Sequence, residues 1–236
     1  MPDAPPRPLR SDAERNRARR SKLPDASPKP LRSDAERNRR LVLEAAAALF
    51  AERGLQVGVA EVAQRAGVGS ATLFRRFPTK QDLIVAVIEA RIAEMRAELE
   101  AALEEPDPWG GVVVAMEALA RLQARDRGLF EAIGGHVAGD EHLHARHAEL
   151  HAILEEIVAR ARDAGALRTD IEAIDLPLLA GSAAGTCQVA GGVAPELWRR
   201  YLGIILDGLR PAAATPLAEP ARTLDEMVAA KAKRAR

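Results

Sequence analysis

The sequence predicts an all-α protein, and three observations lead to that class. Apolar residues recur three and four positions apart through most of the chain after residue 33. Capping-box patterns begin two of these segments, Ser33-x-x-Glu36 and Thr79-x-x-Asp82, and glycine or proline ends several others. The apolar–polar alternation of half-buried strands is absent. With 47% hydrophobic but only 3% aromatic residues, the helices are expected to pack through Ala, Leu, Val and Ile.

The charges divide the chain into a basic front and an acidic body, although the net charge is zero. Residues 1–80 carry 17 Lys and Arg against 9 Asp and Glu, whereas residues 81–211 carry 12 against 22. This asymmetry favours a front that binds a polyanion. The single cysteine, Cys187, excludes an intrachain disulfide, and no secretory signal is visible, so a cytoplasmic location is expected.

The first 32 residues are expected to form a flexible basic arm. They hold 7 of the 15 prolines and 9 Lys and Arg against 4 Asp and Glu, with few apolar residues to support folding. The segment PLRSDAERNR occurs twice, at residues 8–17 and 30–39, and only the second copy continues into an apolar helix. The duplication has no evident physical reason.

Residues 33–81 are predicted to form a compact group of three helices and the start of a fourth. The predicted helices span residues 33–53, about 59–66, about 70–77 and about 80–105. Gly67 permits a tight turn between the two short helices, and Pro78 ends the second of them. Two short helices joined in this way are typical of a helix-turn-helix, whose second helix enters the DNA major groove. The alternative is an ordinary helical hairpin with a solvated basic face.

Residues 82–211 are expected to form one larger helical domain, followed by a flexible tail at 212–236. The predicted helices after the first long one span residues 109–124, 129–137, 141–164, 176–190 and 195–209. Residues 176–195 are uncharged and have the length of a membrane span. Pro177 and four glycines favour a buried packing helix instead, so no membrane contact is predicted.

The segment AERGLQVGVAEVAQRAGVGSATLFRRFPTKQDL, at residues 51–83, closely resembles the DNA-binding region of the tetracycline-repressor (TetR) family of transcriptional regulators. The residues at matching positions are Gly54, Val59, Glu61, Val62, Ala63, Ala66, Gly67, Val68, Thr72, Leu73, Phe77, Thr79 and Lys80. The segment departs from the family pattern at six positions. Leu55 stands where the family has an aromatic residue, Gly58 where it has threonine, and Gly69 where it has serine. Ala71 stands where the family has glycine, Phe74 where it has tyrosine, and Arg76 where it has histidine. These departures shift phosphate binding from hydroxyl groups to arginines.

The resemblance implies a DNA-binding domain at 33–81 and a ligand-binding and dimerisation domain at 82–211. Lys80 stands at the start of a helix, where an ammonium group and the helix N-terminus both favour a phosphate. The residues expected to contact double-stranded DNA are Ser70, Thr72, Phe74, Arg75, Arg76, Lys80, Arg39 and Arg40.

The last helix of the body, in the segment LWRRYLGIILDGL, is apolar around most of its circumference. A surface this wide needs partners on more than one side, which favours a homodimer built as a four-helix bundle. The alternative is burial within one subunit. The residues expected at the dimer interface are Gly181, Gly185, Trp198, Tyr201, Leu202, Ile205 and Leu209.

The resemblance also implies a ligand pocket in the body. The candidate lining residues are Met95, Met116, Phe130, Ile133, His147, Leu150 and Leu154. No charged residue stands out within an apolar stripe, so an apolar or weakly polar small-molecule effector is expected.

All five histidines lie between His136 and His151, and His147 and His151 have the i,i+4 spacing that lets two imidazoles share a metal. A third ligand and a second shell are not evident, so neither a metal nor another cofactor is predicted. His147 is expected to face the pocket, because it falls in an apolar stripe with Leu143 and Leu150.

The function expected from these features is a ligand-responsive repressor that binds a pseudo-palindromic operator as a dimer and is released by its effector. The chain is not expected to be an enzyme. Two alternatives stay open: an activator or a nucleoid-type DNA binder of low specificity, and a helical metalloenzyme that uses the histidines at 136–151.

Overall fold

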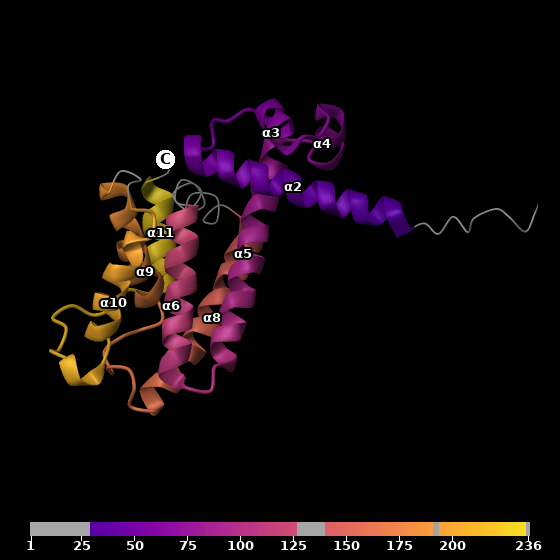
Figure 1. The fold of residues 1–236 in the computed structure, drawn as a ribbon. Helices are drawn as coiled ribbons and strands as arrows, with labels where there is room; N and C mark the ends of the chain where they lie inside the picture. The colour runs from indigo at the N-terminus through magenta and orange to yellow at the C-terminus, as the bar shows by residue number, and fades with distance from the viewer. Residues whose placement is uncertain (1–28, 127–139, 191–193, 235–236) are drawn as a thin grey trace, which may run out of the picture. The chain divides into compact units, whose positions relative to one another are not determined.

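The computed structural model describes residues 29–126, 140–190 and 194–234, and every regular element in these residues is helical (Figure 1). This confirms the all-α class. The helices are α2 (Lys29–Arg53), α3 (Val59–Ala66), α4 (Ser70–Arg76), α5 (Lys80–Glu104), α6 (Pro108–Arg125), α8 (Glu141–Asp163), α9 (Asp175–Val189), α10 (Leu197–Gly208) and α11 (Leu224–Arg234), with a short 3₁₀ turn at Pro211–Ala213. The helix expected at 129–137 lies outside the described residues.

The first helix begins earlier than the capping pattern predicts. α2 starts at Lys29, so Ser33 lies inside the helix and the prediction that it caps the start is wrong. Pro30 occupies the first turn, where a missing N–H group costs no intrahelical bond. The structure divides into two units, and the boundary falls within α2, between Arg39 and Arg40.

The second half of α2 packs with α3, α4 and the start of α5 around a small apolar core. Phe50, Val62, Leu73 and Leu83 each contribute a fully buried side chain from a different helix. Thr79 caps α5 as predicted: its hydroxyl accepts from the Asp82 N–H at 3.1 Å, and Asp82 accepts from the Thr79 N–H at 2.9 Å. The start of α5 is thereby fixed beside the short helices.

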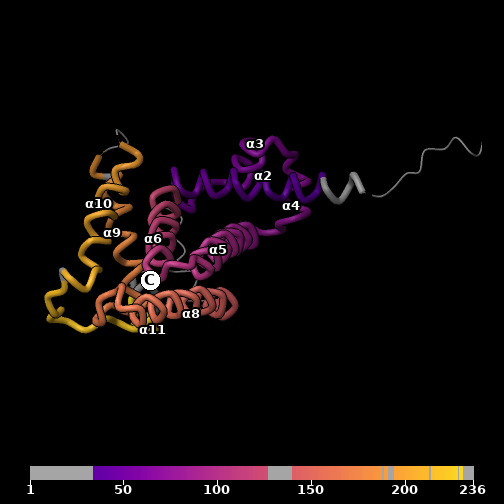
Figure 2. Tube along the Cα trace, turned by 60° about the horizontal axis from the view of Figure 1, so that its bottom comes forward, coloured from indigo at the N-terminus to yellow at the C-terminus, as the bar shows by residue number. Residues whose placement is uncertain are grey.

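The body is a set of long helices that lie along one another. α5, α6 and α8 lie side by side in both views, and α9 and α10 pack together and against α6 (Figures 1 and 2). Their contact is made by buried aliphatic residues, among them Ile88, Leu99, Met116 and Ile157. Gly111 lets α6 approach α5, since a Cβ there would lie 2.7 Å from the carbonyl oxygen of Ala102.

The C-terminal segment contains a helix that was not predicted from the sequence. Residues 212–236 were predicted to be a flexible tail, but α11 occupies 224–234. Thr223 and Glu226 form a capping box at its start, with the Glu226 N–H donating to Thr223 Oγ1 at 3.2 Å and the Thr223 N–H donating to Glu226 at 3.0 Å. The prediction failed because few apolar residues mark this helix.

Candidate functional site

The short helices α3 and α4 are joined by a tight left-handed turn. Gly67 ends α3 with φ +68°, a conformation that glycine adopts without steric cost, and the Val68 N–H returns to the Ala63 carbonyl at 3.1 Å. At the other end of α3, the Gly58 N–H donates to the Glu61 carboxylate at 3.1 Å. Both ends of α3 are therefore fixed, and the geometry is that of a helix-turn-helix.

The second of these helices, α4, presents most of its side chains to solvent. Leu73 anchors it in the core, and Phe77 at its end is also buried. Phe74 is an exposed aromatic ring, with 48% of its surface accessible. The predicted DNA-contacting residues of α4 are all exposed: Ser70, Thr72, Phe74, Arg75 and Arg76.

The cations of this region fall into two groups. On α2 and α3, Arg53 lies 2.6 Å from the Glu61 carboxylate and Arg65 lies 2.6 Å from that of Glu52. The hydrogen bond from Arg65 lowers the pKa of Glu52, and Glu52 in turn raises the pKa of Arg65. The charges of these two arginines are compensated by Glu61 and Glu52, and both ion pairs join α3 to α2.

Arg75, Arg76 and Lys80 form no ion pair with any residue that the structure describes. Arg75 and Arg76 lie on the exposed last turn of α4, and Lys80 is the half-buried first residue of α5. Three uncompensated positive charges thus stand close in sequence around the end of one exposed helix. Such a group can bind phosphates and base edges of a duplex.

The other two predicted DNA-contacting residues lie on α2. Arg40 is exposed and its Nε is 3.8 Å from Glu44. Arg39 belongs to the other compact unit and lies 3.9 Å from Glu36.

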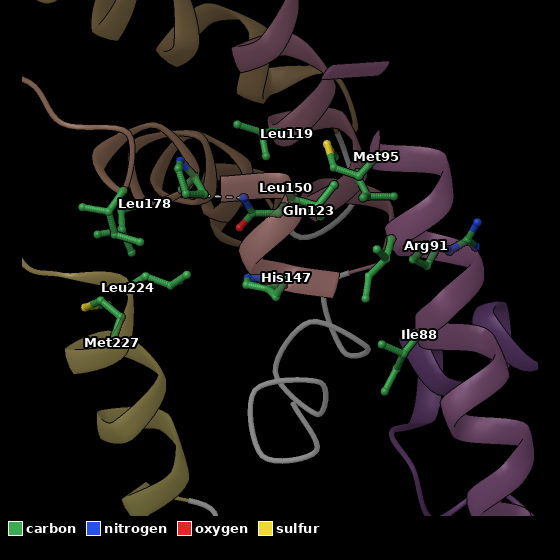
Figure 3. A pocket seen from close by; sticks show the side chains of 14 residues that line it. Ile88, Arg91, Met95, Leu119, Gln123, His147, Leu150, Leu178, Leu224 and Met227 are labelled. Atoms are coloured by element: carbon green, nitrogen blue, oxygen red, sulfur yellow. Dashed lines mark hydrogen bonds between the residues drawn. The ribbon is translucent and has the colours of Figure 1, made fainter. Parts of the chain in front are cut away.

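The body contains a cavity of about 170 Å³ between α5, α6, α8, α9 and α11 (Figure 3). Most of its wall is apolar, and the polar exceptions are Arg91, Gln123 and His147. The lining residues are Ile88, Arg91, Ile92, Met95, Leu119, Leu122, Gln123, His147, Leu150, Ile174, Pro177, Leu178, Leu224 and Met227. A mainly apolar pocket with a few polar groups is typical of a small-molecule site.

The structure places three of the predicted pocket residues, Met95, His147 and Leu150, in this wall. Met116 and Leu154 are buried in the core but do not line the cavity. Phe130 and Ile133 lie outside the described residues.

The prediction that no charged residue stands within an apolar stripe of the body is wrong at Arg91. This residue lies between Ile88 and Met95 on the pocket face of α5. Its Nε is 2.8 Å from Asp126, whose side chain is almost fully buried, and its Nη1 is 2.7 Å from Glu94. The position of Arg91 within the stripe was visible in the sequence, but its pairing with Asp126, directly after the end of α6, was not.

A second arginine completes this charge cluster. Arg125 lies 2.9 Å from Glu94 and 3.0 Å from Asp126. Partial burial raises the pKa of Glu94, but hydrogen bonds and charge from Arg125 and Arg91 outweigh it and lower that pKa overall. The hydrogen bond that Arg125 donates to Glu94 raises the pKa of Arg125. With two arginines and two carboxylates, the cluster has no net charge at neutral pH.

The predicted dimer residues divide into a buried and an exposed set. Trp198, Leu202 and Leu209 are buried within the subunit. Gly181 faces α6 in the same subunit, since a Cβ there would lie 2.6 Å from Gln123 Oε1. Gly185 faces open space, Ile205 is half-buried, and Tyr201 is 42% exposed.

The exposed set extends beyond the predicted residues. Ile204 is 59% exposed and was not included in the predicted interface. An apolar strip therefore stays on the outer side of α10 after the subunit has folded.

The described histidines do not gather around a metal site. No group of three or more His, Cys, Asp or Glu with metal-binding geometry occurs among the described residues, which leave out His136. His142 lies 3.4 Å from Glu89 and His151 lies 3.4 Å from Glu155. Within the same described ranges, no helix is long and apolar enough to cross a membrane.

Two family models match the chain in the regions that hold these sites. The model described as bacterial regulatory proteins of the tetR family matches residues 42–87, and the SbtR-like transcriptional regulator C-terminal domain matches residues 107–211. No protein of curated function is matched at the sequence level.

Solved structures show the same likeness. A TetR regulatory protein from Mycobacterium vanbaalenii is 36% identical, with a TM-score of 0.56 over 77% of this chain and 99% of that chain. The TetR regulator SCO0520 from Streptomyces coelicolor is 29% identical, with a TM-score of 0.56 over 74% and 99%. FadR from Bacillus subtilis, solved with stearoyl-CoA, is 17% identical with a TM-score of 0.53 over 72% and 99%, which is a likeness of fold.

A helix-turn-helix with uncompensated cations, followed by a helical body with an apolar cavity, defines a DNA-binding transcriptional regulator. This chain belongs to the TetR family.

Proposed function

We propose that the protein is a dimeric repressor that binds a pseudo-palindromic operator and is released by a small-molecule effector. The observation that carries the proposal is the group of unpaired cations Arg75, Arg76 and Lys80 around the exposed helix α4, beside arginines that are neutralised. The proposal includes a cytoplasmic location, no enzymatic activity and no metal or other cofactor.

In this proposal α4 is the recognition helix. Ser70, Thr72 and Arg75 read base edges from its exposed face, and Phe74 and Arg76 contact the sugar–phosphate backbone or thymine methyl groups. Lys80 binds a phosphate at the start of α5, and Arg39 and Arg40 add phosphate contacts from α2.

The proposed dimer forms through α9 and α10. Gly185 leaves room for a neighbouring helix, and Tyr201, Ile204 and Ile205 supply apolar area that the subunit does not cover. Trp198, Leu202, Leu209 and Gly181 support this face from inside the subunit. A two-fold dimer presents two recognition helices to two half-sites, which explains the expected palindromic operator.

The proposed effector binds in the cavity and is apolar or weakly polar. Met95 and Leu150 contribute to the apolar wall, and the neutralised cluster around Arg91 offers no net charge to bind an ionic ligand. His147 and Gln123 are the uncharged polar residues of the wall, and Gln123 Nε2 donates to the Pro177 carbonyl at 3.0 Å.

Selection from random duplex DNA tests the proposal, followed by binding measurements on the selected sequence. We expect two inverted half-sites bound by one dimer, with unrelated duplex competing at least a hundredfold less well. Equal competition by unrelated DNA would favour a nucleoid-type binder, and activation of a reporter placed behind the selected site would favour an activator.

A further inference from the structure

The tail helix α11 supplies two side chains to the wall of the cavity. Leu224 and Met227 are three positions apart, so they lie on one face of the helix, and both line the cavity. Figure 3 shows them with Leu178 on the side of the cavity away from Arg91 and Ile88. One end of the cavity is therefore closed by a segment near the C-terminus.

The segment that leads to α11 is joined to the body by hydrogen bonds at residues 215–217. Arg168 donates through Nη2 to the Thr215 carbonyl at 2.5 Å and through Nε to Asp170 at 2.6 Å. Asp170 accepts in turn from the Leu217 N–H at 3.1 Å. These bonds fix the chain at 215–217, six or more residues before α11 begins.

The contacts of α11 itself are few. Its capping box is internal to the segment, and Asp225 lies 4.0 Å from His144 at the surface. The helix also lies beyond the matched family domain, which ends at residue 211. The wall that α11 builds is thus an addition to the part of the body that matches the family.

We infer that α11 is the outer wall of the effector cavity, and that Leu224 and Met227 limit the length of apolar ligand that it accepts. The inference rests on the proposed effector site. Each methylene that an apolar ligand buries raises its affinity about fourfold. Once the ligand chain reaches the two side chains of α11, further methylenes find no buried space and the increase stops.

The test compares the full chain with a truncation that ends at Ala218 and so keeps the hydrogen bonds at 215–217. Binding of the neutral dye N-phenyl-1-naphthylamine is followed by fluorescence, and linear alkanols of increasing length compete with it. For the full chain we expect affinity to rise about fourfold per methylene up to a cutoff length. For the truncation we expect the rise to continue past that cutoff.

Point variants keep the test valid if the truncation is poorly folded. Leu224→Trp fills the wall and is expected to shorten the cutoff, whereas Leu224→Ala with Met227→Ala is expected to lengthen it. Ala229→Leu, at an exposed position of the same helix, is the matched control and should leave the cutoff unchanged. An identical cutoff in all of these proteins would overturn the role of α11 while leaving the effector site intact. Failure of every protein to bind the dye or an alkanol would overturn the effector site itself.

Discussion

Two groups of arginine and lysine in this protein have opposite surroundings. Arg75, Arg76 and Lys80 stand around the exposed end of α4 with no ion-pair partner among the described residues, whereas Arg91 and Arg125 lie between α5 and α6 against Glu94 and Asp126. Burial accounts for the centre of the paired group, because the side chains of Asp126 and Arg91 are only 3% and 18% exposed, and a charge removed from water must be paired. The unpaired cations are therefore free to bind a polyanion, and the paired ones hold helices together.

The largest expected effect comes from breaking the charge cluster at its buried carboxylate, Asp126. Asp126→Ala leaves Arg91 and Arg125 without the buried carboxylate that joins them, and we expect it to lower the free energy of unfolding by about 3 kcal/mol. Urea denaturation measures this loss. The matched control is Glu98→Ala, which removes an exposed ion pair with Arg121 and should cost less than about 1 kcal/mol. Equal losses of unfolding free energy in the two variants would show that the buried Asp126 pair is no more stabilising than the exposed Glu98 pair.

The next effect concerns the exposed apolar strip of α10. Ile204→Glu places a charge at the proposed dimer interface, and we expect monomers whose affinity for the operator falls by about a hundredfold. Sedimentation and fluorescence anisotropy measure the two changes. Arg199→Ala, at an exposed position on another face of the same helix, should stay dimeric. A dimeric Ile204→Glu protein would place the interface elsewhere.

A smaller effect separates the roles of the unpaired cations. Lys80→Ala should weaken binding to all duplexes alike and lower the salt slope by about one, because it removes one phosphate contact. Arg75→Ala should instead change the selected base pairs, at a cost of about 1–3 kcal/mol for the preferred site. Arg65→Ala is the control, since Arg65 is paired with Glu52. If Arg65→Ala weakens binding as much as Lys80→Ala, ion pairing does not decide which cations bind DNA.

The smallest effect is expected from the basic arm. Deleting residues 1–28 leaves all of α2 and removes seven Lys and Arg against four Asp and Glu. We expect binding at low salt to weaken several-fold and the plot of log K against log salt to become shallower. A full-length protein with the arm sequence scrambled should bind as the wild type does. Unchanged affinity and slope in the deletion would show that the arm makes no contact with DNA.

The sequence predicts the DNA-binding region better than the body, for a local reason. The bounds of α3 and α4 follow from Gly58, Gly67 and Gly69 and from Pro78, which act within a few residues of the helix ends. The confirmed family resemblance rests on the same short segment. Signals of this kind need no knowledge of how distant segments pack.

The body depends on contacts between segments far apart in the sequence. Asp126 meets Arg91 across 35 positions, and Gly181 meets Gln123 on α6, so neither partnership can be read from spacing along one helix. α11 was missed because its capping box precedes only a few apolar residues, and its place beside Leu178 in the pocket wall cannot be read from spacing along the chain. Predicting such features requires the packing itself.

The position of α11 outside the part of the body that matches the family has a consequence for how regulators of this kind diversify. A helix with few contacts to the core tolerates substitution better than the buried helices that it covers. Under the proposed effector site, changes at Leu224 and Met227 would alter the range of accepted ligands while the residues around α4 and α10 stay as they were. Segments beyond the shared family domains would then be the place to look when closely similar regulators respond to different compounds.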